Sequence, residues 1–149
     1  MWDDKKSLKL SIVITRLLAG VTAASVFCLP FLTDTYIKMR GMNRALFWNV
    51  TFSLYLCVPL VFAALILLDR MLARINANKV FVPQNVASIR FISWICIILG
   101  IISAICGIVF YLPFVFVSVA VGFCSLILRV IKNVFEKAVI IKNENDFTI

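Results

Sequence analysis

Hydrophobic residues gather in four long stretches, which are separated by short polar segments. The stretches cover about 11–32, 46–68, 91–112 and 113–131. A helix needs about 20 mostly apolar residues to cross the roughly 30 Å hydrocarbon core of a bilayer. Only helices and closed barrels satisfy every backbone polar group in lipid, and these stretches are too long for barrel strands. The pattern therefore predicts an all-α polytopic membrane protein, a single membrane domain over 1–149 built as a four-transmembrane-helix bundle.

Prolines mark the ends and bends of these helices. Pro113 follows a very tight turn, and proline suits the first position of a helix, so it predicts the start of the fourth span. Pro59 lies inside the second span and deprives the Tyr55 carbonyl of its helical donor, which predicts a kink. Pro83 breaks the chain before the third span, whose helix we expect Gln84 or Asn85 to cap.

Two helices are predicted to continue beyond the membrane. Between Asp69 and Asn78, apolar and basic residues alternate at helical spacing, so the second span should run on for two or three turns along the membrane surface. After Arg129 the same periodicity predicts a C-terminal helix and tail over 132–149. The connector before the third span either contacts lipid or forms a groove for a partner. The acidic and apolar tail either frays or docks.

Basic residues set the expected orientation. Twelve of the 15 lysines and arginines lie at one end of the helices, and three lie at the other. The larger group faces the cytoplasm by the positive-inside rule, which gives an N-in/C-in multi-pass protein of a bacterial cytoplasmic membrane. The first stretch resembles a signal peptide in its basic start. We expect a retained helix, because its apolar part is too long and no small-x-small cleavage site follows.

Composition narrows the chemistry. The chain is 63% hydrophobic, has a net charge of +8 and contains no histidine, which removes the commonest general base and metal ligand. All five cysteines fall in apolar stretches without a CxxC pair. We therefore expect no enzyme activity, no cofactor and no catalytic or metal-binding residue. In a membrane protein the positive charge fits orientation and contact with anionic lipid better than direct nucleic acid binding.

Polar and small residues within the spans indicate helix packing. Small residues four apart, such as Gly100 and Ala104, let neighbouring backbones approach, within one chain or in a homo-oligomer. Asn49 is the clearest candidate for a buried polar side chain, and Asp69 is expected to pair with Arg70. The middle of each span lacks Asp and Glu, which disfavours a proton-coupled exporter.

Several segments resemble one family. Phe81, Asn85-Val86, Ile89-Arg90 and the closing Glu-Asn-Asp-Phe-Thr-Ile are similar to the domain of unknown function 2975 family, small bacterial membrane proteins of about four helices. The family's final segment commonly has leucine where Phe147 stands. The resemblance implies no established activity. It does imply a gene neighbourhood that often encodes a small helix-turn-helix regulator of the Cro/cI type.

The resemblance suggests a membrane-bound partner that sequesters or tunes such a transcription regulator. Acidic tail residues would meet the regulator's basic surface, and apolar tail residues would anchor it. The hypothesis places partner binding at Phe81, Asn85, Arg90, Glu144, Asn145, Asp146, Phe147, Thr148 and Ile149. The alternatives are a small transporter or pore, with a polar path beginning at Asn49, Thr51 and Ser53, and an assembly subunit of a membrane complex.

Overall fold

The protein folds into four long antiparallel helices. The computed structural model describes residues 4–41, 43–109 and 112–146, and within them the helices are α1 (Asp4–Arg40), α2 (Leu46–Asn76), α3 (Pro83–Val109) and α4 (Pro113–Asp146). All four are long and apolar enough to cross a membrane. The predicted all-α, four-span architecture is confirmed. Pro113 begins α4 as expected, and both α2 and α4 continue beyond the apolar runs.

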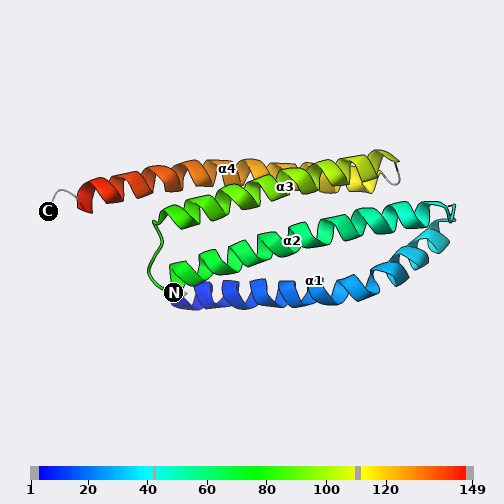
Figure 1. The fold of residues 1–149 in the computed structure, drawn as a ribbon, viewed down its shortest axis with the longest axis horizontal. Coiled ribbons are helices and arrows are strands. Elements are labelled where there is room, and N and C mark those ends of the chain that lie inside the picture. The colour runs from blue at the N-terminus through cyan, green and yellow to red at the C-terminus, as the bar shows by residue number, and fades with distance from the viewer. Residues whose placement is uncertain (1–3, 42, 110–111, 147–149) are drawn as a thin grey trace.

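The four-helix bundle is built as two hairpins joined side by side. α1 packs on α2, α2 on α3, and α3 on α4, with the most extensive contact between α3 and α4. Over the described residues, no Cα atoms of helices that are not consecutive in the chain lie within 8 Å of each other, so α1 and α4 form the two outer helices. Figure 1 shows the start of α1 and the end of α4 at one end, where the α2–α3 connector (residues 77–82) also lies.

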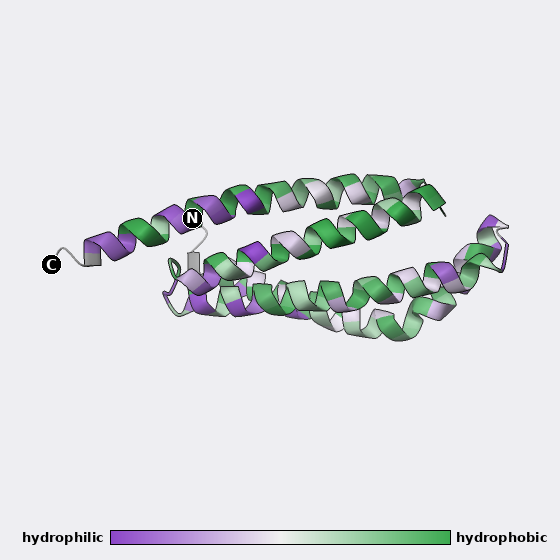
Figure 2. Ribbon diagram, turned by 45° about the horizontal axis from the view of Figure 1, so that its top comes forward, coloured by the Kyte–Doolittle hydropathy of each residue, from purple (hydrophilic) through white to green (hydrophobic). Residues whose placement is uncertain are grey.

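Most large apolar side chains point outward. Figure 2 shows hydrophobic residues along most of each helix, with hydrophilic residues gathered toward the end of α4 and at the turn between α1 and α2. Few side chains are buried inside the chain, and the exposed ones include Phe27, Phe116 and Ile108. A water-soluble protein rarely exposes contiguous apolar surface on this scale, so lipid must cover it. The protein is therefore a multi-pass membrane protein.

α1 is longer than the sequence predicts. Residues after Leu32 were expected to form an outer loop, but the helix continues to Arg40. The hydroxyl of Thr33 donates to the Leu29 carbonyl, and Asp34 pairs with Lys38 one turn later, so polar side chains support these turns. Gly41, with a φ of 60°, then ends the helix in a left-handed conformation that glycine adopts without strain.

A proline inside α1 is accommodated by α2. Pro30 lacks an N–H, so the Val26 carbonyl one turn earlier has no helical donor. The Tyr55 hydroxyl from α2 donates to this carbonyl over 3.1 Å. α1 bends in its second half, as Figure 1 shows. Pro59 likewise lies inside α2, where the sequence placed it.

Small residues bring α3 and α4 together. A Cβ added at Gly100 would lie 3.6 Å from the Ser118 carbonyl oxygen, and one added at Gly107 would lie 2.7 Å from the Val115 nitrogen. Gly100 and Gly107 thus let α3 and α4 of the same chain approach closely. This agrees with the interpretation that the small residues serve packing within one chain. Gly20 in α1 behaves differently, because an added Cβ would meet nothing within 4 Å.

Two serines join α3 to α4 by hydrogen bonds. Ser93 and Ser125 are both buried, and their hydroxyl oxygens lie 3.2 Å apart. Each hydroxyl also donates to the other residue's backbone carbonyl, at 3.2 Å and 3.1 Å.

The prediction that Asn49 is buried is wrong, since its side chain is exposed. The polar contacts between helices come instead from serine, tyrosine and charged residues.

Candidate functional site

Charged side chains gather where both termini lie. We call this the basic end and define it as residues 4–16 of α1, 69–90 of α2, the connector and α3, and 129–146 of α4. At the opposite end, only residues 41–45 and 110–112 separate consecutive helices along the chain. Soluble molecules thus meet a larger polar surface at the basic end.

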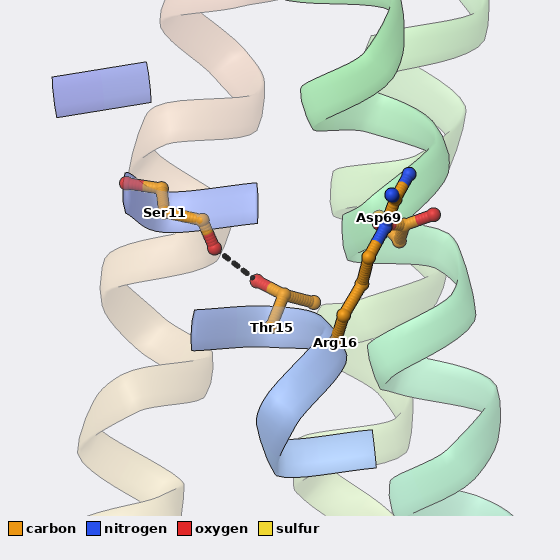
Figure 3. A network of polar contacts seen from close by, with 4 residues as sticks. All are labelled: Ser11, Thr15, Arg16 and Asp69. Atoms are coloured by element: carbon orange, nitrogen blue, oxygen red, sulfur yellow. Dashed lines mark hydrogen bonds and ion pairs between the residues drawn. The ribbon is translucent and has the colours of Figure 1, made fainter. Parts of the chain in front are cut away.

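An ion pair joins α1 and α2 here. The Arg16 Nε lies 3.0 Å from the Asp69 Oδ1, and Figure 3 shows the two side chains meeting between the helices. Next to Arg16 in the sequence, the Thr15 hydroxyl donates over 2.8 Å to the Ser11 carbonyl, which lies one turn earlier in α1. The expected pairing of Asp69 with Arg70 is wrong. Arg70 is exposed, while Asp69 turns toward α1.

Arg74 and Asn85 hold the connector between α2 and α3. Arg74 donates through Nη1 to the Ser88 hydroxyl at 3.3 Å and to the Gln84 carbonyl at 3.4 Å. Asn85 is completely buried, and its Nδ2 donates to the carbonyls of Lys79 and Val80 at 3.0 Å and 2.8 Å. Its Oδ1 finds no hydrogen-bond partner among the described residues.

These contacts correct the expected helix cap. α3 begins at Pro83, so neither Gln84 nor Asn85 stands at the capping position before it. Proline at the first helical position has no N–H to leave unsatisfied, which suits the start of this helix. Asn85 instead ties the connector to α3 from inside the fold.

Two basic side chains form ion pairs with Glu136 of α4. Its carboxylate oxygens lie 3.3 Å from the Arg90 Nη2 and 2.7 Å from the Lys132 Nζ. Glu136 stands beyond the fourth apolar stretch, which ends at Ile131. The hydrogen bond from Lys132, helped by the charges of Lys132 and Arg90, holds the pKa of this carboxyl below its ordinary value. Glu136 is therefore ionised at neutral pH.

A groove opens beside this ion pair. The rings of Phe81 and Phe135 meet at 5.8 Å between centroids, which seats the connector against α4. Next to them lies a groove of about 400 Å³, lined by Pro83, Val86, Ala87, Arg90, Glu136, Val139 and Ile140. Its lining combines apolar residues with the charged Arg90 and Glu136, a composition common in protein-binding surfaces.

The predicted partner-binding residues fall into two groups. Phe81, Asn85 and Arg90 lie where the connector and the first turns of α3 pack near the second half of α4, which we call the α3–α4 contact. Glu144 and Asn145 are exposed on the last turns of α4, eight residues beyond Glu136, about 12 Å at 1.5 Å per residue. The side chain of Asp146 and all of Phe147, Thr148 and Ile149 lie outside the described residues.

Sequence reasoning missed the residues that α4 supplies to the α3–α4 contact. The hypothesis left out Phe135, Glu136 and Val139. Glu136 stands four residues after Lys132, on the helix that the apolar periodicity extends beyond the membrane. Opposite charges at this spacing favour an ion pair on a helix, and this is the signal in the sequence that points to Glu136.

Comparison with known proteins gives one match. A family model described as protein of unknown function, DUF2975, matches residues 34–149. The chain belongs to the DUF2975 family. The DUF2975 match includes the connector and the tail, and it leaves out residues 1–33, which hold most of α1. No curated protein and no solved structure matches the chain.

The DUF2975 description gives no reaction, so chemistry must be judged from the residues. In the described part of the chain, no group of three or more His, Cys, Asp or Glu side chains could hold a metal ion. Side chains at the basic end pair with one another across helix boundaries, through Arg16–Asp69, Arg74–Ser88 and Arg90–Glu136. These contacts position the helices against one another.

Proposed function

We propose that this protein is a membrane-bound partner of a soluble regulator, and that it binds the regulator at its basic end. The partner we propose is a small helix-turn-helix transcription regulator, held or tuned at the cytoplasmic membrane with both termini of the present chain in the cytoplasm. The observation that carries the proposal is the end of α4, which projects past the start of α3 (Figure 1). A helix end beyond the bilayer offers a surface that a soluble protein can reach.

The exposed side chains at the end of α4 include both apolar and acidic residues. Ile140 and Ile141 are 51% and 58% exposed, beyond the apolar stretch that spans the membrane. Large aliphatic side chains outside the lipid stabilise a complex when a partner buries them. Glu144 follows one turn later, so an acidic group stands close to the apolar pair. A regulator with a basic DNA-binding surface complements this combination.

The groove beside Arg90 extends the same surface. It shares Ile140 with the projecting end, so a partner bound to the helix end would also reach Val139 and the Arg90–Glu136 pair. Asn85 would contribute indirectly, because its buried amide holds the connector in place. The partner surface thus combines the α3–α4 contact with the last turns of α4.

Co-purification from native membranes tests the proposal. Full-length tagged protein should capture the small helix-turn-helix regulator, and deletion of residues 143–149 or the Ile141→Asp substitution should abolish capture without lowering membrane abundance. Met39→Asp is the matched control, because Met39 is an exposed apolar residue at the opposite end of α1. Capture of the regulator that is unchanged by both α4 variants would reject the site.

The same preparation separates the alternatives. Recovery of a large membrane complex in place of the regulator would favour an assembly subunit. Solute flux in vesicles containing the purified protein would favour a transporter. For the transporter, the predicted polar path is weak, since Asn49 is exposed and the Ser53 hydroxyl bonds back to the Asn49 carbonyl at 2.9 Å.

A further inference from the structure

A basic cavity lies between α3 and α4 at the level where the apolar stretches end. It measures about 300 Å³ and is lined by Arg90, Ser93, Trp94, Arg129, Lys132 and Asn133. Three of these six side chains are cationic, and none is acidic. Arg90 directly precedes the apolar run of α3, and Arg129 lies two residues before the end of that of α4. The cavity is therefore at the membrane–water interface of the basic end.

The charges around this cavity are only partly compensated. Glu136 is bound to both Arg90 and Lys132, at 3.3 Å and 2.7 Å, so one carboxylate serves two cations. The Arg129 guanidinium lies over the Trp94 ring, 4.9 Å from its centroid, which orients the cation without neutralising it. The Lys132 side chain is only 18% exposed, so its charge is held within the fold. An anion in the cavity would restore the balance.

Trp94 and the helix faces beside it suit a lipid. Tryptophan is enriched at the headgroup level of membranes, where its amphipathic ring is stable. Exposed apolar residues follow it along α3 at helical spacing, Ile98 and Ile101, and precede Arg129 along α4, Leu126 and Phe123. These two stripes lead from the cavity toward the middle of the membrane, where acyl chains lie.

We propose that this cavity binds the phosphate group of an anionic phospholipid in the leaflet at the basic end. Arg90, Arg129 and Lys132 supply the positive charge, and Asn133 supplies amide donors. The adjacent apolar stripes receive the acyl chains. Basic pockets between membrane helices at this depth recognise lipid headgroups through the same combination of charge and position. The lipid proposal does not rest on the proposed regulator, although Arg90 lines both this cavity and the groove of the partner surface.

Native mass spectrometry of the full-length protein in mild detergent tests the site. The probes are phosphatidylglycerol, phosphatidylcholine and inorganic phosphate. The paired variant R129Q/K132Q removes two cations from the cavity. The matched control K137Q/K142Q removes two exposed cations from the same helix outside it. Circular dichroism establishes that both variants keep the wild-type helix content.

The wild type should retain phosphatidylglycerol in preference to phosphatidylcholine. The R129Q/K132Q variant should lose roughly 30-fold in affinity for phosphatidylglycerol, about 2 kcal/mol at tenfold per 1.4 kcal/mol. K137Q/K142Q should retain wild-type affinity. Equal losses in the two variants, or no lipid preference in the wild type, would overturn the proposal. Binding of inorganic phosphate with the same variant dependence, but no retention of phosphatidylglycerol, would overturn the assignment to lipid.

Discussion

The hydroxyl of Tyr55 donates a hydrogen bond to the carbonyl of Val26, 3.1 Å away on the neighbouring helix. That carbonyl lacks a helical donor because Pro30 stands four residues later. In lipid no water replaces a missing donor, so an unsatisfied carbonyl is costly. One side chain of α2 thereby compensates for a proline in α1 and fixes the two helices against each other.

Substitution of Tyr55 should therefore depend on Pro30. We expect Tyr55→Phe to lower the free energy of unfolding by about 1 kcal/mol, because the Val26 carbonyl loses its donor. In a Pro30→Ala background, where residue 30 again provides an N–H, the same substitution should cost less than half as much. Unfolding in mixed micelles of the four proteins of this double-mutant cycle measures both values. An equal cost of Tyr55→Phe in the two backgrounds would contradict the assignment.

Gly107 should be the glycine that tolerates a methyl group least. A Cβ there would lie 2.6 Å from the Val115 Cγ2 and 2.7 Å from its backbone nitrogen, and a rotamer change relieves only the first contact. We expect Gly107→Ala to lower the free energy of unfolding by about 1–3 kcal/mol through overpacking.

Gly20→Ala is the matched control, since a Cβ at Gly20 meets nothing within 4 Å. It should leave stability unchanged or raise it slightly, because alanine favours the helix. The same unfolding assay compares the two variants. A Gly107→Ala protein as stable as Gly20→Ala would show that α3 and α4 are not packed as closely as described.

The spans could be predicted because their signal is strong and local. Four apolar runs of membrane length and a proline at the start of the last one define the helices. The extension of α1 to Arg40 could not be read in this way, since its last turns are polar and resemble a loop. Their hydrogen bonds, such as that from Thr33 to Leu29, become evident only once the helix exists.

The partners of charged residues were harder to predict than the spans. Asp69 pairs with Arg16, 53 residues away, although Arg70 is its neighbour in sequence. Which side of a helix a carboxylate faces depends on how the helices pack, and no local pattern determines this. Arg90 is a predicted partner-binding residue that lies inside α3, and its contact with Glu136 could be found only when α3 and α4 were placed side by side.

The central claim is that the basic end faces the cytoplasm and carries the function. A reporter enzyme that is active only outside the cytoplasm tests the claim most directly, fused in one protein after Ile149 and in another after Gly41. The first fusion should be silent and the second active, with both present at equal abundance in the membrane, because twelve of the 15 basic residues lie at the end that should stay inside. Activity of the fusion after Ile149 together with silence after Gly41 would contradict the account.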